Sequence, residues 1–77
     1  MATTFTVRQG RRYQATLSLG LLERMASNEA IAERLRAAGF AEVSVSGSGA
    51  KRIAKALWPT SDVTAEMPSQ IADVVEI

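Results

Sequence analysis

The chain has 77 residues, 47% of them hydrophobic and 22% charged, with a formal net charge of +1 and neither cysteine nor histidine. These values support one small globular domain without disulfides, without thiolate or imidazole metal sites and without a histidine base. No apolar run approaches the roughly 18 residues of a membrane span, and the polar residues 1–12 lack the apolar segment of a secretory signal. We therefore expect a cytoplasmic protein that binds no cofactor and is not an enzyme.

The charge is unevenly distributed along the chain. All nine basic residues lie at or before Lys55, so that residues 1–55 carry a net charge of +5 and residues 56–77 carry −4. Such a separation indicates either a polarised surface or an acidic tail that folds back against the basic part.

Two runs of alternating polar and apolar residues predict strands near 3–8 and 12–19. The polar residues between them include Gly10 and predict a turn. We expect the two strands either to pair as a hairpin or to leave the first as a looser arm. Residues 21–26 after the second strand suggest a short helical turn.

The clearest predicted element is a helix over residues 28–38. Ser27 suits the N-cap because its hydroxyl can accept a free backbone N–H of the first turn, and Ile31, Leu35 and Ala38 form an apolar stripe. Gly39 stands where a left-handed residue ends many helices. A strand is predicted next, over 42–46, so the helix would be a crossover that places this strand and 12–19 parallel in one sheet.

Residues 44–52, SVSGSGAKR, contain the glycines, hydroxyl groups and basic pair of a phosphate-binding loop. The Walker pattern fails because Gly47 and Gly49 are too close together and no hydroxyl residue follows Lys51, and Arg52 stands where a dinucleotide-binding loop has its third glycine. The glycines are better explained as positive-φ residues of a hairpin turn. Residues 51–58 fit a helix by propensity and a strand by context, and we favour the strand.

Pro59 ends that element, residues 60–69 are predicted to form a loop, and a last strand is predicted over 70–77. The expected fold is a two-layer α+β sandwich, in which one mostly antiparallel sheet of four to five strands packs against the single main helix. This arrangement is related to the ferredoxin-like pattern with its second helix missing or reduced to the 60–69 loop. Part of one sheet face would then be thinly covered, which is typical of an interaction surface.

The thin cover makes a non-catalytic interaction module, assembling with another protein or with itself, the preferred hypothesis. Its interface is predicted to include Leu57, Trp58, Ile71 and Val75, because tryptophan is enriched at interface hot spots and a terminal strand can pair with another chain. For Trp58 taken alone, its position beside Pro59 and Leu57 favours a core anchor or the lid on one, and the partner contact is the alternative.

Basic residues near the two predicted turns support a different hypothesis, binding of nucleic acid. If the turns share an edge of the sheet, these residues form one patch, with Tyr13 and Trp58 nearby to stack on bases. The patch would consist of Arg8, Arg11, Arg12, Lys51, Arg52 and Lys55.

The run IAERLRAAGF, residues 31–40, resembles the helix ending of sporulation-related repeat domains, which bind peptidoglycan. The resemblance covers these residues alone. It implies, as a further alternative, a β-α-β domain that binds peptidoglycan.

Overall fold

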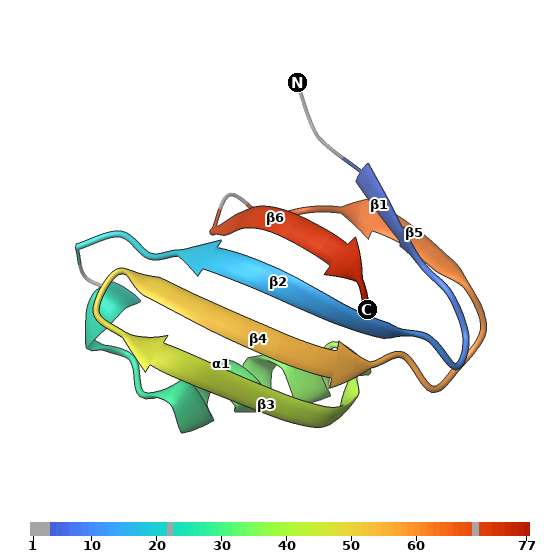
Figure 1. The fold of residues 1–77 in the computed structure, drawn as a ribbon, viewed down its shortest axis with the longest axis horizontal. Helices are drawn as coiled ribbons and strands as arrows, with labels where there is room; N and C mark the ends of the chain where they lie inside the picture. Colours follow the sequence, from blue (N-terminus) through green and yellow to red (C-terminus); the bar gives the residue numbers. More distant parts are fainter. Residues whose placement is uncertain (1–3, 22, 69) are drawn as a thin grey trace.

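The computed structural model describes residues 4–21, 23–68 and 70–77, which form one α-helix, a short 3-10 helix and six strands. In chain order these elements are β1 (Thr4–Val7), β2 (Arg12–Ser18), η1 (Glu23–Met25), α1 (Asn28–Ala37), β3 (Ala41–Ser48), β4 (Lys51–Leu57), β5 (Val63–Glu66) and β6 (Ile71–Glu76). The strands form two antiparallel sheets, one with the order β3-β4-β2-β6 and one made of β1 and β5 (Figure 1). The predicted α+β class, with a sheet packed by one main helix, is confirmed for this part of the chain.

The four-stranded sheet confirms the predicted relation between the strands on either side of the helix. Both β2 and β3 pair antiparallel with β4, which lies between them, so β2 and β3 run parallel to each other. The segment 51–58, which fitted helix or strand, is a strand at the centre of the sheet. Its central position explains the outcome, because hydrogen bonds to neighbours on both sides outweigh the helix propensity of its alanines and lysines.

The hairpin that the glycines predict joins β3 to β4. β3 continues to Ser48, beyond its predicted end at residue 46, and the turn lies at Gly49 and Ala50. Gly47 has a φ of 95° and Gly49 a φ of 67°, in the region that favours glycine. Gly47 is constrained by space as well, since a Cβ there would lie 2.7 Å from the carbonyl oxygen of Lys51.

The helix α1 begins and ends as its flanking residues predict. The Ser27 hydroxyl accepts a hydrogen bond of 3.0 Å from the N–H of Ala30. At the other end Gly39 has a φ of 114°, and the N–H of Phe40 donates to the carbonyl of Leu35 at 3.1 Å. These bonds satisfy backbone groups that a helix terminus otherwise leaves without partners.

The N-terminal strand pairs differently from the hairpin expectation. β1 does not pair with β2 but with β5, in a register that runs from Thr4 opposite Glu66 to Val7 opposite Val63. The prediction that 60–69 is a loop is therefore wrong for Val63–Glu66. This strand is four residues long and its partner is remote in the sequence, so no local pattern marks it.

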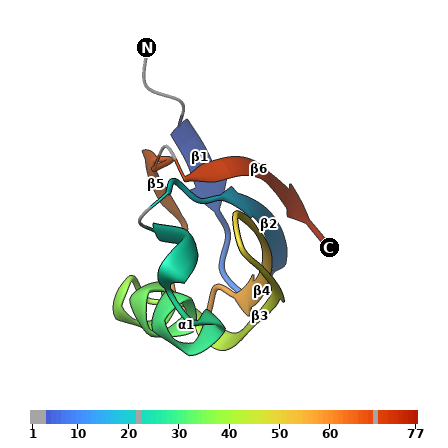
Figure 2. The same cartoon turned by 90° about the vertical axis from the view of Figure 1, so that its left-hand side faces the viewer.

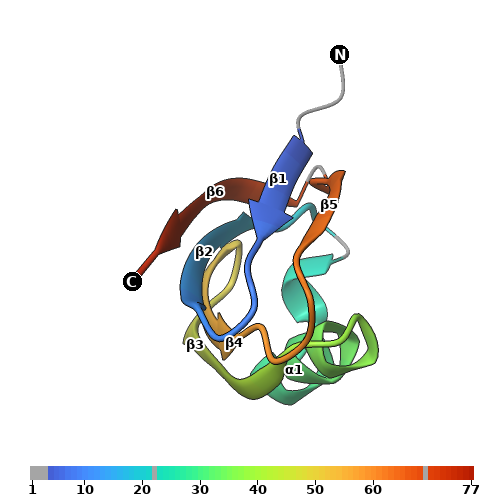
Figure 3. The ribbon, with the colours of Figure 1, turned by 90° about the vertical axis from the view of Figure 1, so that its right-hand side faces the viewer.

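The β1–β5 ribbon and α1 lie on the same side of the four-stranded sheet (Figures 2 and 3). The helix contacts mainly β3, whereas Phe5 of β1 packs edge-to-face on Tyr13 of β2 with ring centroids 5.5 Å apart. We call this side of the sheet the covered face and the other side the open face. Between β4 and β6 the described residues contain β5 in place of a second helix, so the ferredoxin-like architecture is not confirmed.

Candidate interaction site

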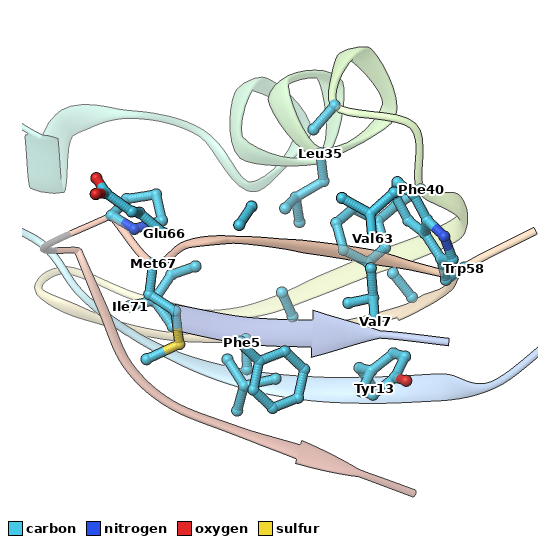
Figure 4. Close-up of a pocket in the computed structure, with 17 residues that line it drawn as sticks. Phe5, Val7, Tyr13, Leu35, Phe40, Trp58, Val63, Glu66, Met67 and Ile71 are labelled. Atoms are coloured by element: carbon cyan, nitrogen blue, oxygen red, sulfur yellow. The ribbon is translucent and has the colours of Figure 1, made fainter. Parts of the chain in front are cut away.

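Three alanines occupy the centre of the covered face, where a core usually contains larger side chains. Ala54 and Ala56 of β4 are buried, and Ala15 of β2 lies directly opposite Ala54. Their single methyl groups do not reach α1 and the ribbon above them. The space that remains is an apolar cleft of about 280 Å³ (Figure 4).

The walls of the cleft come from segments that are far apart in the sequence. Leu35 of α1 and Phe5 of β1 lie across the cleft from each other, and Val63 of β5 lies beside Phe40. Trp58 lies at one end, where its ring meets that of Phe40 edge-to-face with centroids 4.9 Å apart. The cleft therefore exists only when the helix, both sheets and their connections are in place.

Few polar groups face the cleft. Glu66 is the one carboxylate among its lining residues. The Tyr13 hydroxyl, which also belongs to the lining, accepts a 2.7 Å hydrogen bond from the N–H of Arg8. The lining suits an apolar group that is buried away from water.

A second hollow adjoins the cleft and shares Leu35, Pro68 and Ile71 with it. It extends along α1 towards η1, where Glu23 lies at its edge. The hydrogen bond from the Gln70 side chain, and then the one from the N–H of Gly20, lower the pKa of the Glu23 carboxyl below its usual value. This carboxylate thus ties the segment before α1 to the segment before β6.

The predicted interface residues are divided between the two faces of the sheet. Trp58 and Ile71 line the cleft, whereas Leu57 and Val75 lie opposite Arg12 and Gln14 on the open face. The division follows from the strand itself, because successive side chains point to opposite faces. Trp58 is 7% exposed, so its interpretation as a core anchor is confirmed, and it borders the cleft as well.

The predicted basic patch is not assembled as one surface. The turn that carries Arg8 and Arg11 lies at the Trp58 end of β4, where the carbonyl of Trp58 accepts from the N–H of Gly10. Lys51 lies at the opposite end of the same strand, so the two turns do not share an edge. Arg52 cannot contribute to any surface patch, because it is 5% exposed on the covered face.

Three residues of the predicted patch lie on the open face, at different points along the strands. Lys51 and Lys55 project from β4 and Arg12 from β2, where it forms an ion pair of 2.8 Å with Glu42. Gln14 and Ser44 lie opposite Lys55, and Thr16 and Ser46 lie opposite Ile53, which is between the two lysines on this face. The open face therefore carries basic and polar side chains together with Ile53, Leu57 and Val75, whereas the covered face carries the apolar cleft.

The cleft is the feature that the sequence reasoning missed. Its one local signal is the recurrence of alanine at 15, 54 and 56, at every-other-residue positions of the two central strands. That pattern was used to predict strands, but small residues on the buried side also indicate space above them.

No protein-family model matches the chain, and comparison with curated proteins and with solved structures found no match. Within residues 4–21, 23–68 and 70–77, no helix has the length and apolar character needed to cross a membrane. In the same ranges, no group of three or more histidine, cysteine, aspartate or glutamate residues is placed to hold a metal ion. Function is therefore inferred from the geometry of the described residues.

Proposed function

We propose that the protein is a small non-catalytic interaction module that binds an apolar segment of a partner protein in the cleft. The open apolar cleft beside Trp58 carries this proposal. Apolar surface contributes roughly 25 cal/mol per Å² when it is removed from water, so an occupant that covers Trp58, Phe40 and Val63 would be stabilised. A cytoplasmic location belongs to the same proposal.

The strand order supports a finer proposal about the fold. We count β2, β3, β4 and β6 as strands one to four of a single unit. Across the sheet these strands then stand in the order two, three, one, four, and every neighbouring pair is antiparallel. With α1 joining the first two strands, this is the ferredoxin-like pattern, with the β1–β5 ribbon where the second helix would lie. We infer that the cleft results from this replacement, because the ribbon leaves the alanines between itself and α1 uncovered.

The cleft is tested by photo-crosslinking in cells that express the protein. A benzoylphenylalanine replaces Val63, which is 41% exposed beside the cleft, and a control protein carries it at Glu33, on the solvent side of α1. We expect a discrete protein adduct from position 63 at a yield several times that from position 33. Equal yields from both positions would contradict the proposal.

A second variant separates cleft binding from general exposure of position 63. Ala56→Leu extends the side chain from the floor into the empty volume, where it has room to pack without displacing its neighbours. We expect the adduct from position 63 to disappear in this variant, while the far-UV circular dichroism spectrum is unchanged. An adduct that persists would show that the partner does not enter the cleft.

The open face supports nucleic acid as a second candidate ligand, because Lys51, Lys55 and Arg12 share it with hydroxyl and amide side chains. Phosphate contacts make the logarithm of the binding constant fall with the logarithm of salt concentration, with a slope of about 0.9 per contact on duplex DNA. We expect Lys51→Ala/Lys55→Ala to weaken binding and to reduce this slope by about two contacts. Arg36→Ala on α1 is the matched control and should leave the binding constant and its salt dependence unchanged. If the protein binds peptidoglycan and does not bind nucleic acid, the third alternative, a peptidoglycan-binding domain, is favoured.

A further inference from the structure

Among the described residues no strand pairs with the outer edge of β6, which is one edge of the four-stranded sheet (Figure 1). Val75 on this strand is 44% exposed and the neighbouring Ile77 is 58% exposed. Natural sheet edges are usually protected by lysine, proline or a bulge. From Asp73 to Ile77 the strand has none of these, since its bulge lies before Asp73, opposite Thr16 and Leu17.

The other edge of the sheet differs. β3 has a register shift between Ala41 and Ser44, and Glu42 within it has a φ of 51°. The bulge at this edge hinders strand addition, whereas β6 is regular from Asp73 to Ile77 and carries charge only at Asp73 and Glu76. Pairing of β6 with β3 of another copy would also extend without closure into a filament, whereas β6 can pair with its own copy in a closed dimer.

The hydrogen bonds of β6 show which backbone groups are free at this edge. The N–H of Ile77 donates to the carbonyl of Arg12 on β2 at 2.9 Å. Because backbone groups alternate in direction along a strand, those of Val75 and Asp73 also point towards β2. The N–H and C=O groups of Val74 and Glu76 therefore point outward, towards the free edge.

The charges on β6 limit the register of a symmetric pair. An antiparallel pair centred on Asp73 places two carboxylates opposite each other, which is destabilising. A pair centred on Val75 places Val75 opposite its own copy, Asp73 opposite Ile77 and Val74 opposite Glu76. The register centred on Val75 also pairs every residue from 73 to 77, the part of β6 without a bulge. In this register the outward N–H and C=O groups of Val74 can exchange hydrogen bonds with those of Glu76 in the other copy.

We propose that two copies of this chain pair antiparallel along β6 about a two-fold axis at Val75, which joins their four-stranded sheets into one continuous sheet. In this proposal, one partner of the interaction module is a second copy of the chain. The inference rests on the proposed function only in that the chain is taken to act by protein contact. The cleft lies on the covered face and reaches β6, where Ile71 and Val74 line it, whereas the proposed contact uses the free backbone groups at the outer edge of the same strand.

The register is tested with single cysteines, since the chain has none of its own. With the two-fold axis at Val75, the two copies of this residue form a non-hydrogen-bonded pair with Cα atoms about 4.5 Å apart, which is within disulfide range. We expect mild oxidation to convert Val75→Cys to a disulfide dimer at least tenfold faster than Asp73→Cys, whose opposite residue is Ile77. Equal rates, or a faster reaction of Asp73→Cys, would overturn the proposed register.

Sedimentation equilibrium up to millimolar concentration tests the dimer itself. Val75→Glu and Val75→Lys each place like charges together at the axis, so we expect both to weaken dimerisation about tenfold or more. Val75→Ile, the matched apolar variant, should retain the dimer. A monomeric wild-type protein, or a Val75→Lys variant that dimerises more tightly, would overturn the inference. Neither result would affect the crosslink from position 63 to another protein, which tests the cleft separately.

Discussion

Replacing Trp58 with alanine is expected to destabilise the fold by about 3–5 kcal/mol, the range for truncating a buried aromatic side chain. The indole packs on Phe40, and its Nε1–H donates to the carbonyl of Ser61 at 2.8 Å. It also fills the space above Gly39, where an added Cβ would lie 3.0 Å from the indole Cη2. The substitution therefore enlarges the cleft at the point where the end of α1, β4 and the turn after β4 meet.

A domain of this length has a total stability on the order of 4–12 kcal/mol, so this loss is a large fraction of it. Urea titration followed by far-UV circular dichroism measures the change, because the variant has no tryptophan fluorescence. Trp58→Phe is the control; it keeps most of the apolar contact and loses the bond to Ser61, at a cost of about 1 kcal/mol. If Trp58→Ala loses less than Trp58→Phe, Trp58 does not anchor the core.

Replacing Arg52 with alanine is expected to cost about 2–4 kcal/mol, because three acceptors lose a charged hydrogen-bond donor and the packing of a buried side chain is lost. The buried guanidinium donates from Nε to the carbonyl of Gly49 at 3.0 Å, from Nη1 to Oδ1 of Asn28 at 2.7 Å and from Nη2 to the carbonyl of Arg24 at 3.0 Å. These bonds join the β3–β4 turn, the start of α1 and η1. Arg52 is thus a structural link between three segments and not part of a ligand-binding surface.

Two comparisons make the Arg52 prediction specific. Arg36 of α1 forms exposed ion pairs with Glu29 and Glu33, and its replacement by alanine should leave the free energy of unfolding nearly unchanged, as is usual for surface pairs. Arg52→Lys keeps the positive charge but lacks the planar arrangement of donors, so we expect it to lose more than half of the stability that Arg52→Ala loses. Urea titration of all three variants checks both expectations. A fully stable Arg52→Lys variant would show that charge alone matters.

The helix and the central hairpin were predictable because their signals are local. Ser27 and Gly39 mark the two ends of α1, and each acts on backbone groups within one turn of itself. Gly47 and Gly49 mark the hairpin for a similar reason, since a positive φ is a property of one residue. The β-α-β relation between β2 and β3 followed from their order along the chain and the length of the helix between them.

The candidate sites were less predictable, because they depend on which side of a strand and which end of a sheet a residue occupies. Sequence proximity suggested that Leu57 and Trp58 act together, but they lie on opposite faces of the sheet. The sequence predicts one patch from the basic residues near the two turns. The antiparallel pairing of β2 with β4 instead places Arg12 and Lys51 at opposite ends of this strand pair. The sequence predicts Arg52 as part of a surface patch. Its burial has no local signal, because the groups that accept its hydrogen bonds lie on other segments.

The sequence by itself determined the class of the fold, the helix with its two ends, the strands of the main sheet other than β4, and the absence of cysteine and histidine chemistry. These depend on residue type, on periodicity and on backbone preferences that act over a few residues. Only the tertiary structure decided the pairing of β1 with β5, the burial of Arg52, the free edge of β6 and the apolar cleft above Ala15, Ala54 and Ala56. Each of these requires segments distant in the chain to come together, and the space left between them depends on the side chains of all the segments at once.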